Sequence, residues 1–268
     1  MNTFSKNHLS KTVLITGASS GIGAELAKIY AKKGDQLILL ARRISLVENL
    51  IDELKTQFPA LKAFAFQCDV TKESLVKEVV KKAIKAFGKI DTVIANAGRG
   101  MGGNFETLTL DQHRILFETN LFGVLNTIYA TLPYLKQSQG RLAILGSIMS
   151  YISLPKSSSY AMSKAALKSL ADTLQLELKD FGISVTLICP GLVETQIRKV
   201  DLEGVYHQER QDPAPKYLMI GAEKAAQKIY GAIEKRKKEI IITYHGKLAV
   251  FLKRHFPRSF QTLLGQFY

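Results

Sequence analysis

Three residues of the chain have types and a spacing that suit proton transfer. Tyr160 and Lys164 are four residues apart, which places them on one face of a helix, and Ser147 lies upstream of the tyrosine. A free tyrosine ionises near pH ~10, so a tyrosine that exchanges protons near neutrality needs a neighbouring positive charge. The ammonium of Lys164 favours the phenolate form of Tyr160. A Tyr and a Lys on one helix face are usually surface residues, so this interpretation depends on the rest of the sequence.

A glycine-rich turn near the start of the chain supplies that context. Residues 12–15 are a short β-branched and apolar run, residues 16–23 read TGASSGIG, and residues 24–31 favour a helix. Glycine has no Cβ, so its backbone can approach a pyrophosphate, and the N-terminus of the helix offers unpaired N–H groups. The order strand, glycine turn and helix therefore predicts a dinucleotide site. An ordinary strand-to-helix turn is the alternative.

Five motifs in a fixed order resemble the classical short-chain dehydrogenase/reductase family over residues 10–243. They are the TGxxxGxG turn, the Asn-Ala-Gly stretch after residues 92–95, Asn120 within a helix, Ser147 after residues 142–145, and the Tyr160/Lys164 pair. Pro190-Gly191 after residues 184–188 is a further match. The resemblance implies a Rossmann-type fold and hydride transfer between a nicotinamide cofactor and a carbonyl or alcohol. It gives a catalytic set of Asn120, Ser147, Tyr160 and Lys164.

The resemblance also assigns a role to each member of this set. Tyr160 is the acid/base that donates a proton to the developing alkoxide, and Ser147 bonds the substrate oxygen. Lys164 holds the nicotinamide ribose, and Asn120 organises a water that links Lys164 to solvent. Without the other three residues, a helix cap or a core amide would be the better interpretation of Asn120.

The cofactor-binding residues carried over from the family lie in several short segments. Asp69 matches the position that bonds the adenine ring, although it could also cap the helix that starts near Lys72. Thr195 resembles the threonine that contacts the nicotinamide carboxamide, with help from the backbone near Val193. The full expected set is Gly17, Ser19, Ser20, Gly21, Ile22, Gly23, Arg42, Arg43, Asp69, Val70, Asn96, Ala97, Gly98, Tyr160, Lys164, Pro190, Gly191, Val193 and Thr195.

The end of the second predicted strand favours NADP(H) as the cofactor. An NAD enzyme of this fold usually has a carboxylate there for the ribose 2′-hydroxyl, and this chain has Ala41. Arg42 and Arg43 follow, and guanidinium groups suit a 2′-phosphate. We expect Arg42 to be the stronger contact. Two ordinary surface arginines are the alternative, and Ser20 stands where NADP-preferring relatives often carry a basic residue.

Apolar runs that alternate with helical stretches predict the architecture. Counting residues 12–15, the runs lie at 37–40, 63–66, 92–95, 142–145, 185–188 and 240–243. Strands that are apolar throughout are typical of a parallel sheet covered by helices on both faces. We therefore predict an α/β, doubly wound, seven-stranded parallel sheet in a single domain over residues 1–268, with its ligand beyond the carboxyl ends of the strands.

Composition excludes several other classes. The chain has 268 residues, 46% of them hydrophobic, and a formal net charge of +14. Lysines and glutamates that alternate over residues 72–85 indicate a solvated helix face. The sequence shows no basic stripe with exposed aromatics, so we do not expect nucleic-acid binding.

The five histidines show no ligand spacing, so we expect no metal, and Cys68 and Cys189 are expected in the core. Residues 1–10 lack a secretion signal and no window could span a membrane, which predicts a cytoplasmic protein.

Two segments remain outside the shared motifs. Residues 192–220 are longer than an ordinary connection, which favours a substrate loop or lid over a disordered insertion. Residues 246–268 form a basic and apolar C-terminal extension that could pack on the core or a second subunit, cap the substrate pocket, or contact a membrane peripherally. We expect a homodimer or homotetramer built on helices at residues 111–135 and 158–181.

The expected substrate is a lipophilic carbonyl compound or alcohol. The side chains expected to line its pocket are mostly apolar or aromatic: Arg99, Met101, Met149, Tyr151, Leu154, Leu192 and Tyr206. Three alternatives stay open at this point: an NAD-dependent alcohol dehydrogenase, a 3-oxoacyl reductase, and a catalytically silent nucleotide-binding protein on the same fold.

Overall fold

A seven-stranded parallel sheet forms the centre of the protein, in the strand order β3-β2-β1-β4-β5-β6-β9. The computed structural model describes residues 10–100, 102–199, 207, 209 and 215–267. The strands are β1 Thr12–Thr16, β2 Gln36–Ala41, β3 Ala63–Gln67, β4 Thr92–Ala95, β5 Arg141–Leu145, β6 Ser184–Cys189 and β9 Glu239–Ile241. The predicted α/β Rossmann-type fold is therefore confirmed, and six of the seven predicted strands lie within one residue of their expected bounds at each end.

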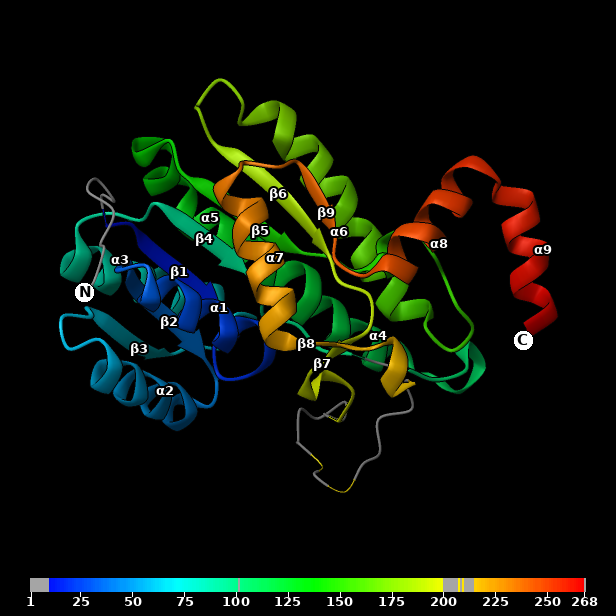
Figure 1. Ribbon diagram of the computed structural model, residues 1–268, viewed down its shortest axis with the longest axis horizontal. Helices are drawn as coiled ribbons and strands as arrows, with labels where there is room; N and C mark the ends of the chain where they lie inside the picture. Colours follow the sequence, from blue (N-terminus) through cyan, green and yellow to red (C-terminus); the bar gives the residue numbers. More distant parts are fainter. Residues whose placement is uncertain (1–9, 101, 200–206, 208, 210–214, 268) are drawn as a thin grey trace.

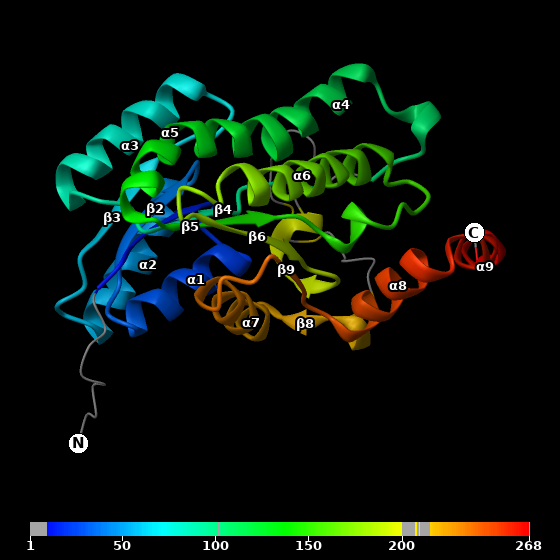
Figure 2. The ribbon, with the colours of Figure 1, turned by 90° about the horizontal axis from the view of Figure 1, so that it is seen from above.

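Helices cover both faces of this sheet (Figures 1 and 2). The helices of the described residues are α1 Gly21–Lys32, α2 Ile44–Gln57, α3 Glu73–Phe87, α4 Leu110–Phe117, α5 Gly123–Ser138, α6 Ser158–Glu177, α7 Ala222–Glu234, α8 Tyr244–His255 and α9 Pro257–Phe267, and of these α8 and α9 lie to one side of the sheet. On one face, Val13 and Ile15 of β1 pack in a core with α1, α2 and α7. On the other, Leu14 packs in a core with α3, α5 and α6. Because successive side chains point to opposite faces, burial on both sides requires the continuous apolar runs.

Three elements differ from the sequence-based expectation. The helix expected over residues 111–135 is α4 and α5 joined by a π-helical turn, Glu118–Phe122, which contains Asn120. The last strand ends at Ile241, because Thr243 instead caps α8 by accepting a hydrogen bond from the Gly246 amide. A second, two-stranded sheet pairs β7 Val193–Glu194 with β8 Ile220–Gly221 at the ends of the long loop.

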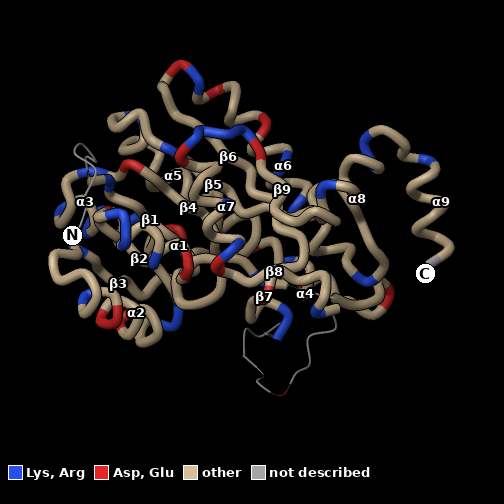
Figure 3. Tube along the Cα trace, viewed as in Figure 1, with Lys and Arg blue, Asp and Glu red and all other residues tan. Residues whose placement is uncertain are grey.

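The charged face of α3 is solvated, as expected. Lys77 pairs with Glu73 and Lys82 with Glu78, each four residues apart, and all four side chains are more than half exposed. Pairs of this kind contribute little to stability. Figure 3 shows lysine and arginine distributed over many elements of the molecule. Cys68 and Cys189 are both buried and free.

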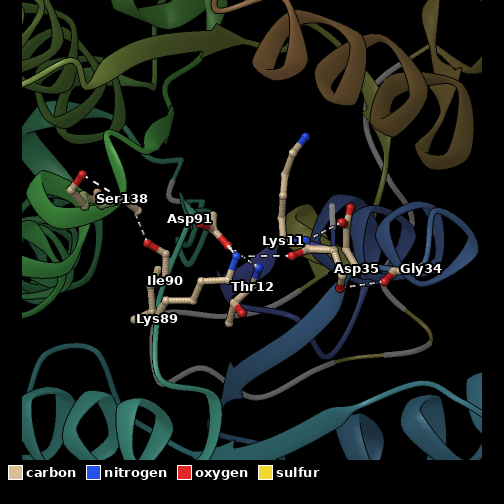
Figure 4. Close-up of polar contacts among 10 residues, drawn as sticks. Lys11, Thr12, Gly34, Asp35, Lys89, Ile90, Asp91 and Ser138 are labelled. Carbon is tan, nitrogen blue, oxygen red and sulfur yellow. Dashed lines mark hydrogen bonds and ion pairs between the residues drawn. The ribbon is translucent and has the colours of Figure 1, made fainter. Parts of the chain in front are cut away.

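Hydrogen bonds tie together the amino ends of the strands (Figure 4). The Thr12 amide donates to Oδ2 of Asp91 (2.8 Å), which also pairs with Lys89 (2.9 Å). The Lys11 amide donates to Oδ1 of Asp35 (2.9 Å), and the Lys11 ammonium pairs with Glu234 of α7. These contacts link the starts of β1, β2 and β4, so this edge of the sheet has a structural role.

Candidate active site

A cavity of about 670 Å³ lies beyond the opposite, carboxyl ends of the strands. Its lining includes the turns after β1, β2, β3 and β4, together with a stretch after β7, Thr195 to Ile197. Most of the expected cofactor-binding residues line it: Gly17, Ser19, Ser20, Gly21, Ile22, Arg42, Arg43, Asp69, Val70, Asn96, Ala97, Gly98 and Thr195. The other expected residues, Gly23, Tyr160, Lys164, Pro190, Gly191 and Val193, are absent from its lining.

The glycine turn is built for close approach of backbone atoms. Gly17 has a positive φ of 67°, a conformation that L side chains rarely adopt. A Cβ added to Gly23 would lie only 2.5 Å from the carbonyl oxygen of Gly17. Nδ2 of Asn96 donates to the carbonyl oxygens of Thr16 (2.9 Å) and Gly17 (3.2 Å), which fixes the turn to the end of β4. Asn96 therefore has a clear positioning role for the glycine turn.

The two arginines after β2 occupy different positions. The guanidinium of Arg43 lies against the glycine turn, 3.3 Å from Oγ of Ser19 and 3.2 Å from Oγ of Ser20. Arg42 also lines the cavity, and its carbonyl oxygen accepts a bond from Gln67. Arg43 therefore contacts the glycine turn, and the expectation that Arg42 makes the stronger cofactor contact stays a prediction.

Asp69 lies at the cavity in a local turn. Its Oδ1 accepts bonds from the backbone amide (3.0 Å) and the hydroxyl (2.9 Å) of Thr71. The residue that precedes α3 is Lys72, and no side chain caps that helix. The alternative interpretation of Asp69 as the helix cap is therefore wrong, because its carboxylate accepts hydrogen bonds from Thr71, which precedes α3.

The four expected catalytic residues come from three elements and meet at one place. Tyr160 and Lys164 lie on α6, Ser147 follows β5, and Asn120 lies in the π-helical turn. The Ser147 side chain lies close enough to Tyr160 to act on the pKa of its phenol. Nζ of Lys164 is 5.7 Å from the centre of the Tyr160 ring, and it donates to the carbonyl oxygen of Leu145 (2.7 Å).

The electrostatics of this group correct one expectation. Burial raises the pKa of Tyr160, while the Ser147 side chain and the positive charge of Arg198 oppose that rise. Burial also lowers the pKa of Lys164 to about 8. The expected lowering of the tyrosine pKa by Lys164 is therefore not seen, because the cost of burying a phenolate exceeds the stabilisation from neighbouring charges. Tyr160 is protonated at neutral pH, the form that can donate a proton.

Asn120 is fully buried and uses its amide to hold the backbone after β4. Its Oδ1 accepts from the Arg99 amide (2.8 Å), and its Nδ2 donates to the Arg99 carbonyl (3.0 Å) and the Ser163 hydroxyl (3.2 Å). A Cβ added to Gly98 would lie 3.3 Å from Oδ1 of Asn120 and 3.8 Å from Nζ of Lys164. The π-helical turn thus links the Asn-Ala-Gly stretch to α6. π-helical turns often occur at functional sites.

The start of the long loop lies over the cavity. The side chain of Thr195 comes within 3.2 Å of a Cβ added to Gly21 of the glycine turn. Arg198 donates to the carbonyl oxygen of Val193 (3.0 Å) and is close enough to Tyr160 to affect its pKa. Sequence reasoning missed Arg198, whose only signal was its place in an unusually long loop. Residues 200–206, 208 and 210–214 of the expected substrate loop lie outside the described residues.

The residues expected to line a substrate pocket divide into several groups. Arg99 is buried and lines the cavity. Tyr151 and Leu154 instead pack in an apolar cluster with α8 and α9. The Met149 amide donates a hydrogen bond to Oγ of Ser147, and the Leu192 carbonyl oxygen accepts one from the Ile220 amide. Met149 and Leu192 therefore make these bonds with their backbone atoms. Met101 and Tyr206 lie outside the described residues.

Within the part of the chain that the structure describes, no group of three His, Cys, Asp or Glu side chains could hold a metal ion. Over the same residues, no helix is long and apolar enough to cross a membrane.

Comparisons with known proteins agree with the fold and the motifs. The family model for short chain dehydrogenase matches residues 11–204. The 11-beta-hydroxysteroid dehydrogenase 1A of Arabidopsis thaliana is 35% identical over 72% of this chain and 55% of its own length, so this chain spans about half of that relative. Dehydrogenase/reductase SDR family member 7B of Mus musculus is 30% identical over 94% of this chain and 80% of its own length.

Solved structures with different cofactors resemble this one. A short-chain dehydrogenase/reductase from Burkholderia phymatum in complex with NAD has a TM-score of 0.81 and 25% identity over 91% of this chain and 93% of its own. A short-chain dehydrogenase from Sphingobium yanoikuyae in complex with NADPH has a TM-score of 0.75 and 27% identity over 88% of this chain and 89% of its own. The chain belongs to the short-chain dehydrogenase/reductase family.

Proposed function

We propose that the protein is an NADP(H)-dependent oxidoreductase that interconverts a carbonyl group and a secondary alcohol on a lipophilic substrate. The observation that carries this proposal is the meeting of Tyr160, Ser147, Lys164 and Asn120 beside a cavity lined by the glycine turn. A catalytically silent nucleotide-binding protein would not need a half-buried tyrosine beside a serine hydroxyl at this place.

The residues around the cavity fit a dinucleotide. Without a Cβ, Gly17 and Gly23 let the glycine turn pack closely on itself and on the end of β4, and the Ser20 side chain does not cap the start of α1, whose amides can then bond a diphosphate. Asp69 lines the same cavity after β3, and by analogy with the family it would bond an adenine ring there. When bound, the nicotinamide supplies or accepts the hydride.

Tyr160 serves as the proton donor in the reductive direction. The phenol is protonated at neutral pH, so it can transfer a proton to the substrate oxygen as negative charge develops there. The Ser147 hydroxyl, which lies beside Tyr160, can turn to bond the same oxygen. Lys164 holds the ribose. Asn120 bonds both the Arg99 backbone, at the cavity, and Ser163 of α6, and so links the two.

The preference for NADP(H) rests on Arg43 and on the absence of a carboxylate at Ala41. Arg43 lies against Ser19 and Ser20, where it could bond a 2′-phosphate with its planar donors. Relatives with NAD and with NADPH share the fold, so the preference depends on these side chains and not on the architecture.

The experiment follows NADPH oxidation by the purified protein with carbonyl compounds graded in size and lipophilicity, with NADH in parallel. Turnover of bulky apolar ketones that is faster with NADPH is the expected result. Faster turnover with NADH would contradict the cofactor assignment alone. Nucleotide binding without turnover of any compound would favour the catalytically silent alternative.

A further inference from the structure

The helix pair α8–α9 has an inner face that packs on the active-site side of the protein. Val250 of α8 and Phe260 of α9 are buried in a cluster with Ile152, and Ile148 and Leu154 pack against it. A Cβ added to Gly246 would lie 2.8 Å from Ile148. The segment that directly follows Ser147 is therefore in contact with this helix pair.

Polar contacts fix the orientation of α8. The hydroxyl of Thr243 caps its first turn, and the guanidinium of Arg254 pairs with Glu239 of β9 (3.1 Å). The same guanidinium lies 4.6 Å from the ring centre of Tyr151. The direction in which the opposite face of α8 points is thus set by the fold.

That opposite face is aromatic and apolar. Tyr244, Leu248, Phe251 and His255 recur at a spacing of three to four residues, which places them on one side of the helix, away from Gly246 and Val250. Tyr244 is 82% exposed, Leu248 61% and Phe251 52%. The ring centres of Phe251 and His255 lie 4.5 Å apart, so these two side chains lie against each other. We call these four residues the α8 outer face.

The surroundings of the α8 outer face are positively charged. Nζ of Lys228 and Nζ of Lys247 lie 5.3 and 5.6 Å from the ring centre of Tyr244. No Asp or Glu follows Glu239 in the sequence, and Figure 3 shows α8 and α9 with blue segments and no red ones. Other exposed apolar side chains have a different setting: Leu176 of α6 is next to Glu177.

These features point to a lipid surface. We propose that the α8 outer face docks on the surface of an anionic bilayer, with its rings and Leu248 in the interface and its lysines at the headgroups. At 12 and 11 residues, α8 and α9 are too short to span a membrane. A second copy of this chain suits the face less well, because two acid-free, positive surfaces would repel each other.

The test is flotation of the full chain with vesicles of phosphatidylcholine alone or with phosphatidylserine added. The double variant L248E/F251E removes the apolar contacts, and K228Q/K247Q removes charge and leaves the apolar residues. The matched control is Leu176→Glu, because this side chain is 73% exposed and lies outside the α8 outer face. Light scattering gives the mass of every variant, and NADPH oxidation is measured separately, because vesicle binding does not depend on turnover.

We expect the unmodified chain and L176E to float with the phosphatidylserine vesicles, less so at high salt. L248E/F251E should lose roughly tenfold or more of its partitioning. K228Q/K247Q should lose its preference for phosphatidylserine. Two results would overturn the proposal: equal and negligible flotation of the unmodified chain on both vesicles, or a lower mass of L248E/F251E, which would make the face a contact between subunits.

Discussion

The two ends of the parallel strands use their polar residues in opposite ways. At the amino ends, Asp35 and Asp91 accept bonds from the backbone of the neighbouring strand, and Glu234 pairs with Lys11. At the carboxyl ends, a cavity of about 670 Å³ separates the turns, and Arg42, Arg43 and Asp69 are among the residues that line it. Charges that satisfy one another stabilise a fold, whereas groups held around an open space are free to act on a ligand.

The largest expected effect is loss of turnover at the carboxyl end. Tyr160→Phe removes the proton donor and keeps the ring, so we expect turnover to fall by roughly 10²–10⁴-fold, with NADPH affinity changed little. Steady-state kinetics and NADPH fluorescence titration measure the two properties. Retained turnover in this variant would remove Tyr160 from the mechanism.

A methyl group in the glycine turn should impair cofactor binding. In Gly23→Ala the new Cβ would lie 2.5 Å from the Gly17 carbonyl oxygen, so the turn must shift, and NADPH affinity should fall by roughly tenfold or more. Gly231→Ala in α7 is the matched control, because nothing lies within 4 Å of its added Cβ. Unchanged NADPH affinity in Gly23→Ala would show that the turn is not a close-approach site.

The two arginines after β2 provide a sharper comparison within the carboxyl end. Arg43→Ala should weaken NADPH binding by roughly tenfold and leave NADH binding nearly unchanged, because a charged hydrogen bond to the 2′-phosphate is lost. Arg42→Ala should have the smaller effect on NADPH. Titration of both nucleotides against both variants tests this, and the reverse ranking would confirm the sequence-based prediction of Arg42 as the main contact.

The amino end should affect stability without affecting chemistry. Asp91→Ala leaves the Thr12 amide and Lys89 without their acceptor, at a cost of about 1–3 kcal/mol, which lowers the Tm by several degrees. Glu73→Ala, which breaks an exposed pair with Lys77, is the control and should change the Tm little. Calorimetry measures both. A fall in kcat/KM of folded Asp91→Ala would contradict the division between the two ends.

The smallest effect concerns pH. The Lys164 pKa is lowered to about 8, so its ammonium loses a proton as pH rises through that value. NADPH affinity should therefore decline by roughly threefold above pH 8, because a neutral amine attracts the anionic cofactor less strongly. Lys164→Met should show weaker binding with no such decline between pH 7 and pH 9. An equal decline in both proteins would assign the pH dependence to another group.

Local pattern was enough to predict most of the fold. Residues such as Val13, Leu14 and Ile15 are apolar in succession because both faces of β1 are buried, and this rule identified the seven strands. The glycine turn was predicted because its backbone conformation and its close contacts exclude side chains. The π-helical turn at Asn120 was not, since its sequence is compatible with an ordinary helix.

The sequence by itself determined the sheet, the glycine turn and the identity of the residues that could do chemistry. Only the tertiary structure decided which of two adjacent arginines contacts the glycine turn, that Arg198 lies near Tyr160, and that burial raises the tyrosine pKa. The reason is physical. Strands and tight turns follow from local sterics and burial periodicity, whereas side-chain direction, desolvation and charge at a site depend on segments far apart in the chain.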